Sequence, residues 1–517
     1  MNLRAVAALL LVCAGLLAGC DRKDTPADGG PVFSVLAGSE VRDIEPALVQ
    51  AAREAGVALK LSYAGTLDIV ERVNAGEAYD AILPASGAYP ALALVNKPLA
   101  REKLFYSRVA LGVKAEKLKA LGWDRKAPTW ADIAKAAGSG RLRFAMTNPA
   151  SSNSGMSAVF AVASAVAGKT EDLAASDVDA KVLTAFLSGQ KLTAGSSGWL
   201  AEAFAKAPGE LDAMVNYESV LLRNNAKLPP ADQLVPVYPQ DGVISADHPL
   251  MLLAEARRAD YDKLVGAFKA QAFQQRVAAD AFLRPSVQGV PLAPGLSGAV
   301  AVELSFPNRI DVIDAVLASY QGEWRRPATS IFVLDTSGSM AGERLDDMRA
   351  ALKVLAGADA RSASARYARF QSRERVVLIS FSDRVDEPVE VGFKPDAMDA
   401  ARRQVLGYAD GLHVKGGTGI FAALLKAEDI ARHERAADPD RYVSIVLLTD
   451  GENNAPPDLA GFQRRMAGAP ATRIFPILFG EASNADMAAL ADGSGGRVFD
   501  GRKSALALVF KEIRGYQ

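Results

Sequence analysis

The chain has few of the residues on which many hydrolases, zinc proteins and nucleic-acid-binding proteins depend. Its 517 residues include only 3 His and 2 Cys. The histidines, His248, His413 and His433, are spread too far apart in the sequence to predict a zinc site. Lys plus Arg (59) and Asp plus Glu (60) nearly balance, so the basic excess typical of nucleic-acid-binding proteins is missing. The G-x-S-x-G, H-E-x-x-H and G-x-x-x-x-G-K motifs are also missing, and we expect no enzymatic activity.

The composition is that of a folded protein with more than one domain. Half of the residues are hydrophobic and 23% are charged, which excludes a disordered chain. The length exceeds what a single core usually supports, so we expect two or three domains.

Both cysteines lie in the first 20 residues, which have the form of an export signal. Arg4 gives a positive start, and residues 5–18 form an apolar stretch that is short for a membrane span. The stretch ends Leu17-Ala18-Gly19-Cys20, which resembles the lipobox of bacterial lipoproteins. The resemblance implies removal of residues 1–19, acylation of Cys20 and a lipid anchor in a membrane. Asp21 resembles the signal for retention in the inner membrane, facing the periplasm. An ordinary signal peptide with a chance Cys is the alternative.

The rest of the sequence has the pattern of an α/β protein in two blocks. Residues 20–31 are polar and contain Gly and Pro, which predicts a flexible tether. In residues 32–285, short apolar strands alternate with helical stretches. Residues 286–327 predict a linker that ends in a connecting helix, and residues 328–517 form the second block. The connecting helix carries apolar residues at three- and four-residue steps, which predicts one shared face: Ile310, Ile313, Leu317, Tyr320 and Trp324.

Polar side chains follow the strands of the second block. Its continuous apolar strands predict a parallel sheet that is buried on both faces. Asp335, Ser337 and Ser339 come directly after the first strand, Thr418 opens a helix, and Asp450 follows another strand. Because ligands gather at the carboxyl ends of parallel strands, we expect these five oxygen-bearing side chains to converge. The alternative is that the hydroxyls only cap helices while Asp450 sits in a turn.

Together these five residues resemble the metal-ion-dependent adhesion site of the von Willebrand factor A (VWA) domain. The resemblance covers about residues 328–515 and implies a doubly wound, Rossmann-like fold. It also implies that the two serines and the threonine bind the ion, with one or both aspartates acting through water. An oxygen-only ligand set favours Mg²⁺, although Mn²⁺ or Ca²⁺ stays open. A carboxylate (Asp or Glu) from a protein partner would complete the coordination.

The loops of the first block are similar, more diffusely, to those of type 2 periplasmic solute-binding proteins. The resemblance covers about residues 32–285 and implies two α/β lobes with a ligand cleft between them. Lobe one would comprise about 32–105 plus 245–285, with lobe two between. The neutral hydroxyl, amide and phenol groups at helix starts are our candidate contacts with a small polar solute: Ser39, Thr66, Ser86, Ser152, Asn153, Ser154 and Tyr217. Helix capping explains many such positions equally well, and the cleft could instead serve as a scaffold.

These features predict a lipid-anchored binding protein of the cell envelope. The second block would bind a protein through its metal, and the first would hold a solute. The alternative is an accessory solute-binding component of an ABC-type transport system. A connecting helix between the blocks raises the hypothesis that closure of one block changes what the other presents.

The anchor makes a simple prediction. Cys20→Ala removes the acylated thiol, so the protein should leave the membrane fraction. Fractionation followed by immunoblotting measures this, with Cys13→Ala, inside the removed segment, as the matched control. A Cys20→Ala protein that stays in the membrane would place the anchor elsewhere.

Overall fold

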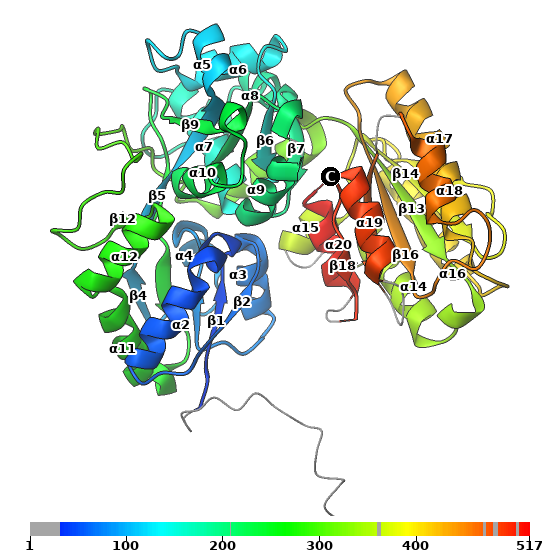
Figure 1. Ribbon diagram of the computed structural model, residues 1–517, viewed down its shortest axis with the longest axis horizontal. Helices are drawn as coiled ribbons and strands as arrows, with labels where there is room; N and C mark the ends of the chain where they lie inside the picture. Colours follow the sequence, from blue (N-terminus) through cyan, green and yellow to red (C-terminus); the bar gives the residue numbers. More distant parts are fainter. Residues whose placement is uncertain are drawn as a thin grey trace, which may run out of the picture.

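The computed structural model describes residues 31–206, 208–358, 363–468, 472–478, 484–502 and 506–516. The predicted signal peptide, Cys20 and residues 20–30 of the predicted tether lie outside these residues. Within the described ranges, no helix has both the length and the apolar character needed to cross a bilayer. Three β-sheets with helices packed on them build the protein, so the predicted α/β class is confirmed (Figure 1).

Lobe one of the N-terminal domain contains a five-stranded sheet that is covered on both faces. Its strand order is β2-β1-β3-β11-β4, formed by Leu59–Tyr63, Phe33–Ala37, Ala81–Leu83, Pro249–Leu252 and Ala100–Lys103. Strand β1 is parallel to β2 and β3, whereas β11 is antiparallel to β3 and β4. Its helical elements are η1 (Ser39–Ile44), α2 (Glu45–Glu54), α3 (Thr66–Asn74), α4 (Ala88–Ala93), α11 (Arg258–Phe268) and α12 (Gln271–Ala281).

Lobe two contains a seven-stranded sheet. The main order is β10-β5-β8-β6-β7, formed by Ser245–Ala246, Phe105–Lys114, Ala213–Tyr217, Phe144–Thr147 and Gln190–Ala194. Strands β9 (Leu234–Val237) and β12 (Arg284–Pro285) also pair with β5. Its helices are α5 (Ala115–Ala120), α6 (Trp130–Gly138), α7 (Asn153–Val166), α8 (Ala180–Ser188), α9 (Ser197–Lys206) and α10 (Glu218–Asn225).

The chain crosses between the two lobes at three places. It passes from β4 to β5 at Leu104, returns from β10 to β11 at Asp247 and His248, and passes again from α12 to β12 at Phe282 and Leu283. These crossings lie on one side of the domain, and the C-terminal domain lies on the other (Figure 1). The crossings therefore have the position of a hinge.

A connecting helix leads from the N-terminal to the C-terminal domain. It comprises α13 (Ile310–Ser319) and a π-helical turn, η6 (Tyr320–Trp324). Ile313, Leu317, Tyr320 and Trp324 are buried, as predicted. Ile310 was expected on the same face but is 41% exposed, because the helix begins there and its first side chain projects beyond the packed surface.

The C-terminal domain contains a six-stranded sheet with helices on both faces. The order is β15-β14-β13-β16-β17-β18, formed by Val389–Gly392, Glu374–Phe381, Ala328–Asp335, Tyr442–Thr449, Arg473–Leu478 and Phe499–Asp500. All of these strands are parallel except β15. Its helices are α14 (Glu343–Leu355), α15 (Ala363–Ala368), α16 (Met398–Gly411), α17 (Ile420–Ala437), α18 (Leu459–Met466), α19 (Asn484–Ser494) and α20 (Leu506–Arg514).

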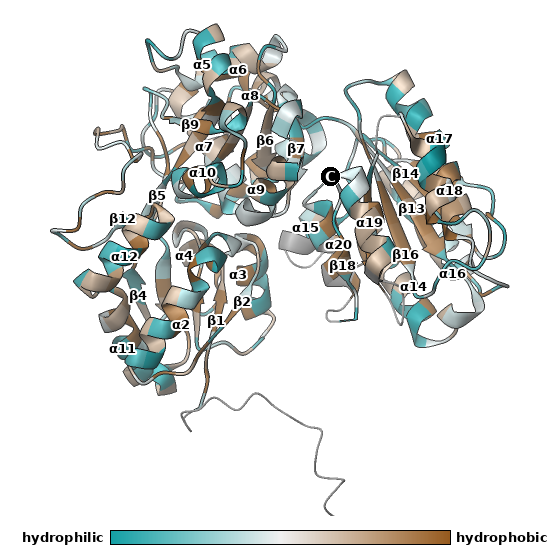
Figure 2. Cartoon of the chain, viewed as in Figure 1, coloured by the Kyte–Doolittle hydropathy of each residue, from teal (hydrophilic) through white to brown (hydrophobic). Residues whose placement is uncertain are grey.

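Alternation of side chains along the central strands divides this core into two layers. On β13, Ile331 and Val333 face α17, α18 and α19, while Phe332 and Leu334 face α14, α16 and α20. The middle of each central strand therefore carries apolar side chains toward both faces, as the predicted two-sided burial requires (Figure 2). This packing fixes the carboxyl ends of β13 and β16 side by side at one edge of the sheet.

Candidate functional site

The register of the C-terminal sheet brings the predicted metal-binding loops together. Strand β13 pairs in parallel with β16, with Leu334 opposite Leu448. Asp335 and Thr449 are the next residues along the two strands, and Asp450 then begins its loop. The Thr449 hydroxyl donates to Asp335 Oδ2 over 2.7 Å, which ties the two strand ends together.

The loop after β13 curls back over the strand end. The backbone N–H of Ser337 donates to Asp335 Oδ1 over 2.8 Å. The hydroxyls of Ser337 and Ser339 lie 3.1 Å apart, and Ser339 Oγ donates to Asp450 Oδ1 over 2.8 Å. Four of the five predicted ligands thus form one connected set of oxygen atoms.

Thr418 joins this set from a third loop. The Thr418 N–H donates to Asn454 Oδ1 over 2.7 Å, which fixes the start of α17 against the loop that follows β16. A Cβ placed on Gly451 would lie 3.7 Å from Thr418 Oγ1 and 3.8 Å from Ser339 Oγ. The two hydroxyls therefore border the same small space, which a glycine leaves open.

The charges at this edge are buried. Asp335 is fully buried, and its burial raises the pKa of its carboxyl group; the nearby Asp450 carboxylate acts in the same direction, against hydrogen bonds from Thr449 and Ser337. Arg344 of α14 forms an ion pair with Asp450. Two carboxyl groups in such a dry position favour a nearby cation.

The donor set fits a hard divalent cation. It consists of carboxylate and hydroxyl oxygens, the ligands that Mg²⁺ prefers. Among the residues that the structure describes, no three His, Cys, Asp or Glu side chains cluster as metal ligands. A cation at this edge would thus depend on the hydroxyls, and its presence stays a prediction.

Our sequence reasoning missed Arg344, Thr449 and Asn454 at this edge. Thr449 had a signal, because it directly precedes Asp450 at a strand end. Arg344 and Asn454 had none, because an Arg near the start of a helix and an Asn in a loop are common on any surface.

In the N-terminal domain, four of the seven predicted solute contacts form one polar network in lobe two. Asn153 Nδ2 donates to the Tyr217 hydroxyl over 2.9 Å. The Ser154 hydroxyl lies 2.8 Å from that of Ser197 and 3.4 Å from that of Ser152. Ser152, Asn153, Ser154 and Tyr217 are all buried.

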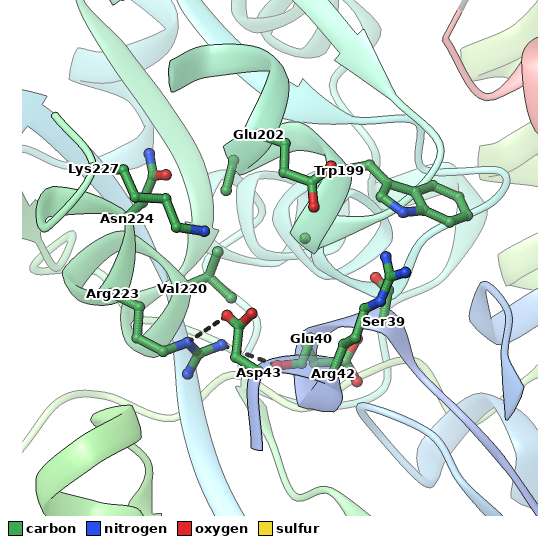
Figure 3. A pocket seen from close by; sticks show the side chains of 12 residues that line it. Ser39, Glu40, Arg42, Asp43, Trp199, Glu202, Val220, Arg223, Asn224 and Lys227 are labelled. Carbon is green, nitrogen blue, oxygen red and sulfur yellow. Dashed lines mark hydrogen bonds and ion pairs between the residues drawn. The ribbon is translucent and has the colours of Figure 1, made fainter. Parts of the chain in front are cut away.

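Lobe one meets this network through Ser39 and Glu40. A Cβ on Gly198 of lobe two would lie 3.3 Å from the Ser39 carbonyl oxygen, so the two backbones are in close contact. Ser39 Oγ and Glu40 Oε1 are buried without a hydrogen-bond partner. Both residues line a cavity of about 30 Å³ between the lobes, room for a water molecule (Figure 3).

The other two predicted contacts lie apart from this cavity. Ser86 Oγ accepts a hydrogen bond from the N–H of Ala88, the first residue of α4, over 3.3 Å, and its role as a solute contact stays a prediction. Thr66 begins α3 next to Gly65, where a Cβ would collide with the Ser151 carbonyl oxygen of lobe two. Thr66 therefore lies at another point of contact between the lobes.

Three charged or titratable residues of the cleft were missed from the sequence. Arg223 of lobe two pairs with Asp43 over 3.0 Å and donates to the Glu40 carbonyl oxygen over 2.9 Å, which fastens the lobes together (Figure 3). Burial raises the pKa of Glu40 to about 7. His248, at the hinge, is fully buried against Tyr217, and burial lowers the pKa of its imidazole to about 4. Isolated residues of these types carry no signal in the sequence.

Comparison with known proteins finds a different family in each domain. Residues 33–282 match the model of bacterial extracellular solute-binding proteins, and residues 330–452 match that of the von Willebrand factor type A domain. Inter-alpha-trypsin inhibitor heavy chain H4 of Sus scrofa is 33% identical over 129 residues, 24% of this chain and 12% of the pig protein. The Homo sapiens protein is 30% identical over 139 residues, 26% of this chain and 13% of its own length. The chain thus spans only about an eighth of these relatives.

Solved structures with a similar fold include two periplasmic binding proteins. The periplasmic binding protein AfuA from Actinobacillus pleuropneumoniae, with fructose-6-phosphate bound, is 14% identical with a TM-score of 0.43, covering 56% of this chain and 97% of that one. A periplasmic thiamin binding protein is 14% identical with a TM-score of 0.45, covering 56% and 95%. Similarity at this level does not indicate a solute for this chain.

The buried Glu40 makes a prediction about pH. Because the pKa of Glu40 is raised from 4.5 to about 7 in the folded protein, the folded state holds this proton more tightly than the unfolded state. The unfolding free energy should therefore fall as pH rises from 4.5 through 7, by about 3 kcal/mol from this group. Glu40→Gln removes this loss, so its melting temperature should rise relative to wild type across that range.

Calorimetric melting of the full chain between pH 4.5 and 8 measures the difference. Glu54→Gln, exposed on α2, is the matched control and should follow wild type throughout. Parallel curves for wild type and Glu40→Gln would show that Glu40 is not a strained buried acid.

Proposed function

We propose, for a chain that combines a solute-binding domain with a VWA domain, that it is an extracytoplasmic binding protein with no catalytic step of its own. The VWA domain would recognise a protein partner through a bound divalent cation, and the two-lobed domain would hold a small polar solute. The observation that carries the proposal is the connected set of oxygens from Asp335, Ser337, Ser339 and Asp450, with Thr418 beside it.

Each residue of this edge has a distinct role in the proposal. The Ser337, Ser339 and Thr418 hydroxyls would bind the cation, and Asp335 and Asp450 would supply negative charge directly or through water. Bound Mg²⁺ would supply an open coordination position that attracts a carboxylate oxygen of a partner. The backbone hydrogen bond from Ser337 to Asp335 holds the loop in place before any ion arrives.

The edge is open to a large partner. Gly338 and Ser339 are exposed, as are Gly416 and Glu452 around them. The N-terminal domain contacts the opposite edge of the sheet, where Lys191 of lobe two pairs with Asp440, just before β16, over 3.1 Å. A protein can therefore reach the candidate metal site without displacing the N-terminal domain.

Arg344 opposes a cation at this edge. Its guanidinium forms an ion pair with Asp450 and thus places a positive charge beside the proposed ion. The Arg344 side chain is 41% exposed, so it can move into solvent when a cation binds. In our proposal Arg344 lowers the affinity for the ion and keeps Asp450 paired in its absence.

The solute and the location complete the proposal. The buried hydroxyl, amide and carboxyl groups between the lobes favour a small polar solute that can donate hydrogen bonds. The solute-binding family of the N-terminal domain supports a place outside the cytoplasm. The lipobox-like sequence before Cys20 supports a lipid anchor, with Asp21 favouring the inner membrane.

Substitutions at the sheet edge test the cation. Asp335→Ala and Thr418→Ala should each weaken Mg²⁺ binding by roughly tenfold or more, because each removes a donor or the charge that holds it. Arg344→Ala should strengthen Mg²⁺ binding, because it removes a competing positive charge. Calorimetric titration of the EDTA-treated full chain with MgCl₂ measures all three.

The matched control is Asp396→Ala, an exposed loop carboxylate of the same domain that should bind Mg²⁺ like wild type. Unchanged Mg²⁺ uptake by the Asp335→Ala/Thr418→Ala double variant would refute the site. For the function itself, a pull-down from solubilised membranes should recover a partner that is lost with EDTA and with Asp335→Ala. A partner kept in both would show binding without the cation.

A further inference from the structure

The C-terminal domain contacts both lobes of the N-terminal domain, on the side opposite the hinge. In Figure 1 its helices α15 and α20 face the line where the lobes meet, while β5 and β12 lie at the far side. Any opening of the lobes about the hinge moves this outer side most. The contacts made there therefore decide whether the lobes can separate.

The closest contact with lobe two involves Gly515 and Tyr516, which follow α20. A Cβ on Gly515 would lie 2.5 Å from Gly195 Cα, so the two backbones touch. Tyr516 stacks on Trp199 with ring centroids 6.5 Å apart, and the Arg497 guanidinium lies 4.1 Å from the Trp199 ring. Backbone contact of this kind leaves no room for a layer of water.

The contact with lobe one lies beside it. Helix α15 packs against α3 of lobe one. A cavity of about 140 Å³ lies where the three bodies meet. Its walls come from lobe one, lobe two and α20, and include Gly65 and Asp68, Ser151 and Trp199, and Val509 and Glu512, respectively.

This C-terminal segment is part of the rigid core of its own domain. Arg514 forms a buried ion pair with Glu374 of β14, with N–O distances of 2.6 and 2.8 Å. Phe510 packs against Phe332 of β13 at 5.7 Å between ring centroids. The segment therefore moves with the whole C-terminal domain.

We propose that α20 and the residues after it form the third wall of the solute cleft, and that together with α15 they clamp the two lobes together. The cleft then cannot open to admit or release a solute unless the C-terminal domain leaves it. The inference rests on the proposed function only in calling the cleft a solute site. Opening of the lobes and docking of the C-terminal domain depend on the same contacts. A change that opens the lobes should therefore weaken docking, and a change that undocks the C-terminal domain should loosen the lobes.

Substitution of two glycines can disturb docking of the C-terminal domain and closure of the lobes separately. Gly515→Ala pushes the C-terminal domain away from Gly195, and Gly65→Ala pushes lobe one away from Ser151. Gly493→Ala in α19 and Gly266→Ala in α11 are the matched controls, because a Cβ there has nothing within 4 Å. The measurement is amide hydrogen exchange of the full chain, which needs no solute or metal.

The clamp predicts effects that cross the interfaces. Gly515→Ala should speed amide exchange about fivefold or more in residues 39–44, the part of lobe one that packs on α9 of lobe two. Gly65→Ala should speed exchange to a similar extent in residues 506–514. Should Gly515→Ala unfold its own domain, Lys191→Glu/Lys206→Glu replaces it, since it repels Asp440 and Asp492 across the interface. The clamp would be overturned if Gly515→Ala changed amide exchange only in residues 195–199 and 512–516 while Gly65→Ala left exchange in residues 506–514 unchanged. That result would leave the cation and solute proposals standing.

Discussion

Two carboxyl groups are held out of water at one edge of the parallel sheet of the C-terminal domain, and the candidate metal site is built around them. Asp335 and Asp450 follow adjacent strands, and the register of β13 with β16 fixes them next to each other. Burial of two acids in one place is costly unless hydrogen bonds and a cation offset the charge. Thr449, Ser337 and Ser339 provide the hydrogen bonds, and Arg344 provides one positive charge from the solvent side. The proposed function requires that a divalent cation offsets the buried negative charge more effectively than Arg344 does.

The two domains share one interface, which lies away from the candidate metal site. The edge of the C-terminal sheet with the candidate metal site faces solvent, while α15, α20 and the opposite sheet edge face the N-terminal domain. A partner at the metal site and a solute in the cleft would therefore not compete for space. Any influence between them would pass through the body of the C-terminal domain to its last helix, which Arg514 and Glu374 fix to the sheet.

Much of this could be predicted from the sequence where the pattern is local. The apolar runs 33–37 and 59–63 predict strands that match to the residue. The runs 330–334, 376–380, 443–448 and 474–479 predict four strands of the C-terminal sheet to within two residues, because continuous apolar runs between turns leave few alternatives. Convergence of Asp335 and Asp450 followed from strand order alone. Contacts that join distant segments, such as Gly195 with Gly515 or Arg344 with Asp450, have no local pattern. Serines such as Ser86 set another limit, because a serine that bonds a helix N–H and a serine that binds a ligand look the same in sequence.

The divalent-cation site can be tested by anomalous diffraction from crystals of the full chain, grown without divalent metal and soaked in MnCl₂. We expect one strong manganese peak at the carboxyl edge of β13 and β16, about 2.1 Å from the Ser337 and Ser339 hydroxyl oxygens, with Arg344 turned away from Asp450. A map with no peak at this edge, and Arg344 still paired with Asp450, would contradict this expectation.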